Sequence, residues 1–378
     1  MADLAGVIHP GDGILWGQAC AEPQTLVEAL VSQRASCTGA RVFMGVHYTG
    51  IVKPEHADHL RLASYCGTGA NRALADAGVL EILPAPYSQF GILIAQKAIP
   101  CDVVMVQVSP PNARGEYSLG LGVEYLAPAL KAARAVIAEV NDQVPWTHTE
   151  PLLRKSDFAL VVESSRPPVV LTFPEPKERE LRMAQYAAQF IPEGAVLECG
   201  IGTAPNAVLA ALRGRRKLSV HTGVVCDGVV DLDPRKCSGG ALIGSQRLFD
   251  WARENSALRL RSSDYTHGAA TLAQIERFVA INSAVEVDLT GQVNGEVGGG
   301  SYVGAVGGAL DFIRAANQSA GGVSIIALPA SRVVERLSGP VSVPRSEAGV
   351  FVTEKGAADL RGCTLRERER RMAAIAAL

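Results

Sequence analysis

Short apolar runs alternate along this chain with longer stretches rich in alanine, leucine and charged residues. Nearly continuous runs of valine, isoleucine and leucine are typical of strands buried on both faces. Such runs occur at 102–108, 135–140, 158–163 and 324–328. The longer stretches predict helices at 25–34, 125–134, 178–189, 245–255 and 365–377. This alternation indicates an α/β protein built on parallel sheets.

A weak internal repeat relates the two halves of the chain. Five residue identities recur at an offset of 182 residues: Pro10 with Pro192, Leu15 with Leu197, Pro23 with Pro205, Ala29 with Ala211 and Leu30 with Leu212. Each copy has the pattern of a strand, a proline-containing loop and a helix, and a further strand then ends in a histidine. We therefore predict two tandem α/β domains of related topology, at 1–176 and 177–378, divided in a stretch rich in proline and charge.

Composition narrows the class of protein. A chain of 378 residues with 48% hydrophobic content is long enough to bury two cores. The formal net charge of −2 argues against a general attraction to nucleic acid or anionic lipid. The eight scattered cysteines form no CxxC pair, so no metal is expected, and no apolar stretch reaches membrane-spanning length. These features, with an amino terminus unlike a signal peptide, predict a cytoplasmic protein without nucleic-acid or membrane partners.

Two glycine-containing segments are candidates for binding. Gly200, Ile201 and Gly202 follow a predicted strand and precede a predicted helix, where free backbone N–H groups suit an oxyanion, a carboxylate or a phosphate. A tight turn without a ligand fits this loop about as well. The glycine-rich segment 291–308 predicts a close backbone approach to a ligand or to another element, with a flexible surface loop as the alternative.

Six segments in sequence order resemble the acetyl-CoA hydrolase/transferase family, which includes the 4-hydroxybutyrate CoA-transferases. They are 107–111 with Gly115 and 118–120; 139–141 with Pro145 and Thr147; 200–202 with Pro205; 288–289 with 291–293; 306–308 with 311–312; and 353–354 with Gly356 and 359–362. The resemblance implies a CoA-transferase-like fold with the active site in the cleft between two α/β domains. It also implies coenzyme A as part of an acyl-CoA substrate, a small acceptor, and a homodimer.

The resemblance places Gly223, within 221–232, where the family carries its nucleophilic glutamate. In the family that carboxylate attacks the acyl-CoA carbonyl, and a glutamyl-CoA thioester forms on the enzyme. Glycine can form no such intermediate. By position in the family, Glu354 lines the active site. The other residues implied by position are Gly307 as an oxyanion donor, Gly200, Ile201, Gly202, Gly304 and Gly308 as further backbone donors or CoA contacts, and Gln107, Asn141 and Gln292 in the substrate cleft.

A second departure from the family occurs at His267, in the sequence Tyr265-Thr266-His267-Gly268, where the family has an asparagine. An imidazole titrates near neutral pH, so His267 is a candidate general base, although a lone histidine in a loop is often structural. Cys226 is a candidate nucleophile or acid, with a packed small hydrophobic residue as the alternative. The missing side chain at Gly223 also predicts open space beside the thioester.

These features favour an acyl-CoA enzyme in which water or a non-carboxylate acceptor attacks the thioester directly. One alternative is CoA-dependent decarboxylation or proton transfer, with Cys226, His267 or Glu354 moving the proton. A second is a non-catalytic acyl-CoA binder. A third is CoA transfer through another glutamate, such as Glu354 or Glu296.

Overall fold

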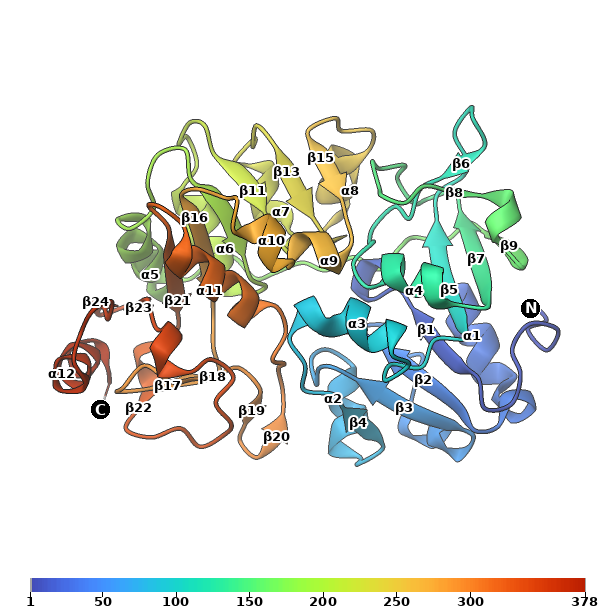
Figure 1. Ribbon diagram of the computed structural model, residues 1–378, viewed down its shortest axis with the longest axis horizontal. Helices are drawn as coiled ribbons and strands as arrows, with labels where there is room; N and C mark the ends of the chain where they lie inside the picture. Colours follow the sequence, from blue (N-terminus) through green and yellow to red (C-terminus); the bar gives the residue numbers. More distant parts are fainter. Residues whose placement is uncertain (1, 378) are drawn as a thin grey trace. The chain divides into compact units, whose positions relative to one another are not determined.

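The computed structural model describes residues 2–377, which form two compact units (Figure 1). Unit 1 contains the residues up to 85, residues 89–171 and residues 240–265; unit 2 contains residues 86–88, 172–239 and 266 onwards. The units differ from the sequence segments 1–176 and 177–378 because each takes in a short piece from the other half of the chain. Among the described residues, no helix is long and apolar enough to cross a membrane.

Unit 1 is built on a parallel sheet of seven strands in the order β4-β3-β2-β1-β5-β7-β9. The strands are β1 (Gly13–Trp16), β2 (Ala40–Met44), β3 (Leu60–Ser64), β4 (Leu80–Ile82), β5 (Val103–Val108), β7 (Ala135–Asn141) and β9 (Leu160–Ser164). The helices are α1 (Gln24–Ser32), α2 (Asn71–Asp76), α3 (Phe90–Ala95), α4 (Leu126–Ala132) and α8 (Gln246–Ala252). Short strands are β6 (Glu116–Tyr117), β8 (Leu153–Arg154), β14 (Ala241–Leu242) and β15 (Leu258–Leu260). All six residues of β5 are buried, because helices cover both faces of the sheet.

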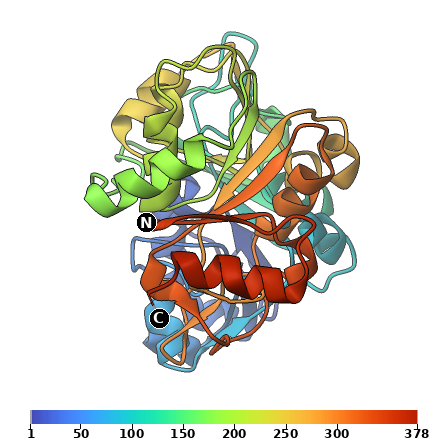
Figure 2. The ribbon, with the colours of Figure 1, turned by 90° about the vertical axis from the view of Figure 1, so that its left-hand side faces the viewer.

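Seven strands of the second large sheet lie in unit 2, in the order β13-β11-β10-β16-β21-β23-β24, and only the last pairs antiparallel. They are β10 (Val196–Cys199), β11 (Ser219–His221), β13 (Cys237–Gly239), β16 (Phe278–Asn282), β21 (Val323–Ala327), β23 (Val350–Thr353) and β24 (Gly356–Asp359). The helices are α5 (Glu178–Ala188), α6 (Thr203–Ala211), α7 (Asp227–Val230), α10 (Ala269–Leu272), α11 (Ala309–Gln318) and α12 (Leu365–Ile375). Short strands are β12 (Val224–Val225), β17 (Glu286–Asp288), β18 (Val293–Asn294), β19 (Val297–Gly298), β20 (Ser301–Tyr302) and β22 (Val333–Val334). Figure 2 looks onto the side of unit 2 where α5 and α12 lie in front.

The two sheets share one topology. Each begins at a central strand, β1 or β10, moves outward on one side, and returns to the other side of that strand with β5 or β16. Ligands of such doubly wound sheets bind outside the carboxyl ends of the strands, at the point where the strand order reverses. The prediction of tandem α/β domains of related topology is therefore confirmed. The nine strands and helices predicted from the apolar pattern are present, with ends shifted by a few residues.

A small aromatic cluster places α10 and α11 on β16 in unit 2. Its buried members are Leu272, Phe278, Ala280, Phe312 and Ala316. Figure 1 shows both helices on the near side of the strands of unit 2. Because Phe312 lies in the first turn of α11, the packing also holds the amino end of this helix beside the loop before α10.

Candidate active site

His267 lies in unit 2, in the loop between α9 (Ser263–Thr266) and α10. Its ring lies between two aromatic side chains that are tilted against it, with centroid distances of 4.8 Å to Tyr87 and 4.5 Å to Phe312. Only 4% of His267 is exposed, and its Nδ1 lies 2.9 Å from the hydroxyl of Thr266. The ring is thus fixed in orientation by one hydrogen bond and two apolar faces.

Gly223 lies two residues after the end of β11, against the ring of His267. A Cβ atom built on Gly223 would lie 3.0 Å from both Cε1 and Nε2 of His267, and a Cβ on Gly308 would clash with the same Nε2. The prediction of open space beside Gly223 is therefore wrong, because the imidazole of His267 fills that volume. Glycines at 223 and 308 leave Nε2 at the amino end of α11.

Burial determines the charge of His267. Removal from water lowers the pKa of its imidazole to about 3, and the neighbouring charge of His221 lowers it further. His221 is itself held by a contact of 2.8 Å between its Nε2 and the carbonyl oxygen of Thr266. The prediction that His267 titrates near neutral pH is wrong for this structure. At pH 7 the ring is neutral, with one nitrogen facing Thr266 and the other facing the two glycines.

This low pKa gives a prediction for folding. The unfolded chain binds a proton at His267 near pH 6.5 and the folded chain only near pH 3, so the folded state loses stability as pH falls through that window. The loss approaches about 1.4 kcal/mol per pH unit well below pH 6.5 and is smaller between pH 7 and 6. Urea unfolding at pH 7, 6 and 5 is expected to show a weaker acid dependence, by about this amount, in the His267→Asn variant. Parallel pH curves for the two proteins would contradict the low pKa. Burial also lowers the pKa of His47, to about 4, and this contributes to the acid dependence of both proteins. Comparing the variant with the wild type removes that common contribution.

The glycine-rich segment 291–308 contributes to this site only at its end. Gly307 has a φ of +58°, and its carbonyl accepts the N–H of Tyr87 at 3.0 Å, which holds Tyr87 beside His267. Asp311, in the first turn of α11, accepts a hydrogen bond from the hydroxyl of Ser88 at 2.8 Å.

Gly304, in the same segment, lies against the carbonyl of Gly295, where a side chain would clash. Gly304 is thus explained by a close approach of backbone to backbone. The first N–H groups of α11, by contrast, lack acceptors within the helix, and Gly308, which precedes this end of the helix, lies against His267 Nε2.

The loop Gly200–Gly202 lies at the carboxyl end of β10, where the strand order of unit 2 reverses. Gly200 donates its N–H to the carbonyl of Ile281 at 2.8 Å, and Gly202, with a φ of +142°, precedes α6. Asn282 packs against Gly200 and donates to the buried carboxyl group of Glu198 at 2.8 Å. Burial raises the pKa of Glu198 to about 8, so its carboxyl group is mostly neutral at pH 7. The sequence analysis did not single out this residue. A charged residue next to a glycine loop at a strand end is the signal that could have found it.

Cys226 lies close to Cys199 and donates to Asn206 Oδ1 at 3.1 Å. The hydrogen bond from the Cys199 thiol lowers the pKa of Cys226. Both cysteines are buried, and no hydrogen bond joins either to His267 within residues 2–377. The catalytic role of Cys226 stays a prediction, and its packing resembles that of a small core residue.

Glu354, Gln292 and Glu296 have hydrogen bonds of their own in unit 2. Glu354 accepts the N–H of Ala330 at 2.9 Å, and Gln292 donates to Asp288 at 2.6 Å. Glu296 accepts the hydroxyl groups of Ser342 at 2.7 Å and Tyr302 at 2.8 Å. None of the three is hydrogen-bonded to His267 in the described part of the chain, and the site roles of these residues stay predictions.

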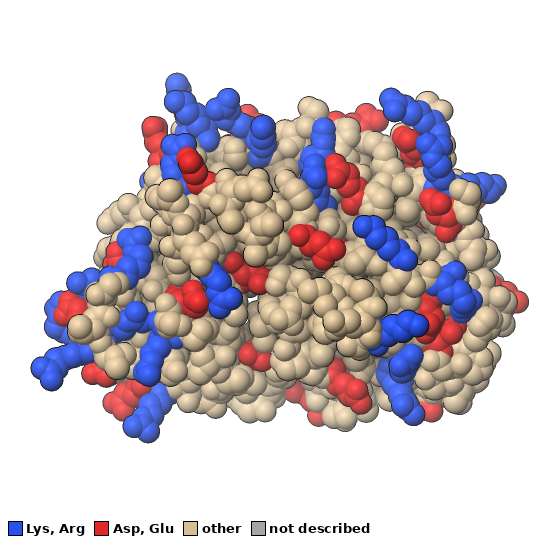
Figure 3. Space-filling model, viewed as in Figure 1, with Lys and Arg blue, Asp and Glu red and all other residues tan. Residues whose placement is uncertain are grey.

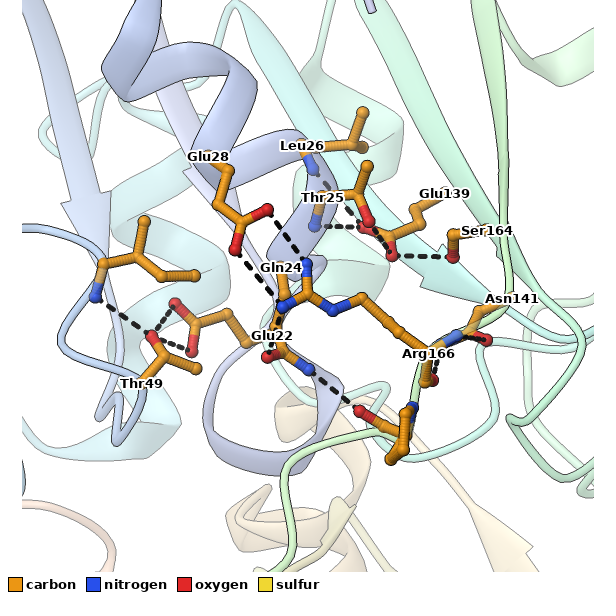
Figure 4. Close-up of polar contacts among 12 residues, drawn as sticks. Glu22, Gln24, Thr25, Leu26, Glu28, Thr49, Glu139, Asn141, Ser164 and Arg166 are labelled. Atoms are coloured by element: carbon orange, nitrogen blue, oxygen red, sulfur yellow. Dashed lines mark hydrogen bonds and ion pairs between the residues drawn. The ribbon is translucent and has the colours of Figure 1, made fainter. Parts of the chain in front are cut away.

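In unit 1 the amides of Gln107 and Asn141 meet at the ends of β5 and β7. Asn141 Nδ2 donates to Gln107 Oε1 at 3.2 Å and to the carbonyl of Arg166 at 2.8 Å. Figure 4 shows the adjoining network, in which Arg166 reaches Glu28 and Gln24. Glu22 is fully buried there and accepts the Thr49 hydroxyl, and burial raises the pKa of Glu22 to about 7. The sequence analysis did not single out Glu22. A carboxylate shortly after a central strand is a signal that could have identified it, because ligands of such sheets bind beyond the carboxyl ends of the central strands.

Two doubly wound α/β units in tandem, with a histidine and glycines at the carboxyl ends of parallel strands, define a two-domain α/β protein with an enzyme-like site. The acetyl-CoA hydrolase/transferase N-terminal domain matches residues 1–164 and the corresponding C-terminal domain matches residues 244–377. The 4-hydroxybutyrate coenzyme A transferase of Clostridium kluyveri is 33% identical, over 96% of this chain and 90% of the relative. The chain therefore belongs to the acetyl-CoA hydrolase/transferase family.

Solved structures agree with this assignment. RipA from Yersinia pestis has a TM-score of 0.93 at 29% identity, covering 99% of this chain and 92% of RipA. The 4-hydroxybutyrate CoA-transferase of Porphyromonas gingivalis has a TM-score of 0.81 at 30% identity, with the same coverage of both chains. Because its relatives are CoA transferases and acetyl-CoA hydrolases, the protein is an acyl-CoA transferase/hydrolase-like enzyme.

Proposed function

We propose that this enzyme cleaves acyl-CoA by direct attack of water, or of a non-carboxylate acceptor, on the thioester carbonyl. The observation that carries the proposal is the contact between His267 and Gly223. Where the family resemblance places a nucleophilic glutamate, the chain has a glycine, and the imidazole of His267 occupies the adjacent volume.

In the proposed reaction the nucleophile's oxygen or nitrogen bonds to the carbonyl carbon, and the carbon–sulfur bond then breaks. His267 accepts the nucleophile's proton at Nε2 and passes it to the departing sulfur, which gives free CoA and the acyl product. Because a pKa of about 3 makes the free ring a weak base, the proton transfer to His267 relies on the negative charge that develops on the thioester carbonyl beside it, and the proton then moves on to the departing sulfur. The first N–H groups of α11 stabilise the oxyanion, a role worth on the order of 3 kcal/mol per donor.

A borohydride experiment tests this proposal. The protein is incubated with an acyl-CoA and borohydride, and its intact mass is measured while released CoA thiol is followed with a thiol reagent. We expect CoA release without a carboxylate acceptor and no change in protein mass, since no glutamyl thioester forms. A CoA-transferase known to form the intermediate serves as the positive control.

CoA transfer through another glutamate would give a different outcome. A reduced glutamate mapped to Glu354 or Glu296, together with a requirement for a carboxylate acceptor, would defeat direct attack. The hydrogen bonds of both carboxylates to groups of the protein are one reason to favour direct attack. A cytoplasmic homodimer stays a prediction alongside this function.

A further inference from the structure

A cavity of about 620 Å³ opens at the amino ends of the parallel strands of unit 2. It is lined by Glu193, Gly194, Lys217, Ser219, Arg235, Lys236 and Arg277. These residues stand at the starts of β10, β11, β13 and β16 or just before them. The candidate active site lies at the carboxyl ends of the same sheet, and a four-residue strand spans about 13 Å. The cavity is therefore on the opposite edge of the sheet from His267.

Positive charge dominates the lining of this cavity. Four of the residues are lysine or arginine, and Glu193 is the one carboxylate among the seven. Within residues 2–377, none of these four cationic side chains forms an ion pair or a side-chain hydrogen bond. Asp233 and Glu276 are nearby in sequence but do not line the cavity. Figure 3 shows lysine and arginine side chains gathering on the edge of the molecule over the β10–β13 region.

Unit 1 provides an internal comparison at the same edge of its own sheet. A cavity of about 560 Å³ there is also lined by cations, including Arg41 and Arg134. In unit 1, however, Arg41 lies 4.0 Å from Asp102 and Arg134 lies 2.8 Å from Asp12. The cations at the edge of unit 1 are thus partly neutralised by carboxylates.

The shared topology shows what differs between the two edges. Asp102 directly precedes β5, and Arg277 directly precedes β16, the corresponding strand of unit 2. The internal repeat likewise matches Asp12 with Gly194. Unit 2 therefore has an arginine and a glycine where unit 1 has two neutralising carboxylates. Solvation of a sheet edge alone does not require such an excess of positive charge.

We propose that this cavity binds a small anion carrying two or more phosphate groups, at a site separate from that of the acyl-CoA thioester. Two guanidinium groups suit bidentate contacts with phosphate oxygens, and two ammonium groups add point charges. Gly194 leaves the backbone open to close approach, with Arg277 Nη1 only 3.5 Å from where its Cβ would be. Lys217 and Arg277 also hold left-handed backbone, with φ of +66° and +51°, a conformation often retained at functional sites.

Calorimetric titration with inorganic pyrophosphate in a low-salt, phosphate-free buffer tests the proposal. We expect saturable binding by the wild-type protein and binding at least tenfold weaker in the Arg235→Gln/Arg277→Gln variant. The matched control is Arg332→Gln/Arg336→Gln, which removes two exposed cations outside the cavity and so changes net charge equally. Thermal unfolding confirms that both variants fold. Absence of wild-type binding to pyrophosphate and ATP at millimolar concentration, or equal weakening in both variants, would overturn the proposal.

Coenzyme A also contains a pyrophosphate group, so a second arm identifies the source of the phosphate. Pyrophosphate is titrated again in the presence of saturating CoA, and KM for acyl-CoA is measured in the Arg235→Gln/Arg277→Gln variant. Unchanged pyrophosphate binding and unchanged KM support a separate site. Displacement by CoA together with a raised KM would instead make the cavity the nucleotide end of the substrate's own site. The titration requires no turnover, so its outcome is independent of the proposed reaction.

Discussion

Replacing His267 with asparagine is expected to lower kcat/KM for acyl-CoA cleavage by about 100-fold or more, because general acid–base transfer typically contributes that much. Asparagine fits between Tyr87 and Phe312 but cannot accept a proton at the position of Nε2. Free CoA released from a series of acyl-CoAs is the measurement. The wild-type pH profile should show no loss of activity from His267 above about pH 4, because the ring is protonated only near pH 3.

His47→Asn is the control for the loss of a buried histidine. His47 lies in unit 1, is 1% exposed, and has two ring nitrogens without a hydrogen-bond partner in the described part of the chain. This variant is expected to keep wild-type kcat/KM. Unchanged turnover in His267→Asn, or an acid limb near pH 6.5 that disappears in this variant, would contradict catalysis by a His267 that is neutral at pH 7.

The second large effect concerns a pair of residues. Gly223→Glu alone is expected to give no glutamyl-CoA adduct and to lose about 1–3 kcal/mol of stability, because its Cβ meets the His267 ring at 3.0 Å. Gly223→Glu/His267→Asn removes the obstacle. It is expected to recover part of the stability and to form an adduct that borohydride traps.

Intact mass and urea unfolding of both single variants and the double variant complete the cycle. The expected signature is non-additivity, with adduct present only in the double variant. If Gly223→Glu alone were as stable as wild type and formed the adduct, His267 would not be what excludes a glutamate from position 223. Failure of the double variant to form adduct would show that further parts of the transferase site are missing.

The sequence predicted the strands and helices of the fold better than it predicted which of the two units each segment of the chain belongs to. Buried strands such as β5 and β7 carry their own signal, since nearly every residue is apolar. The assignment of residues 240–265 to unit 1 has no local signal, because it depends on which strands these residues pack against. Two-residue strands such as β18 and β19 are too brief for a periodic pattern.

The candidate site shows the same limit. The family resemblance singled out Gly223 and His267, and the structure places them in contact. It did not give the charge of His267, because the pKa depends on the distant residues Tyr87 and Phe312 that bury the ring. It also implied site roles for Glu354 and Gln292, which stay predictions; in unit 2 each has a hydrogen-bond partner of its own.

The short segment 86–88 has a consequence for biosynthesis. Ser88 is hydrogen-bonded to Asp311, which lies 223 residues further along the chain. At usual rates of translation, residues 86–88 wait roughly 10 to 45 s for that partner to be made. Tyr87 likewise waits for His267, which lies 180 residues further along the chain. A nascent chain that ends before α10 therefore contains most of the unit 1 strands but not the histidine that packs against Tyr87 in the folded protein.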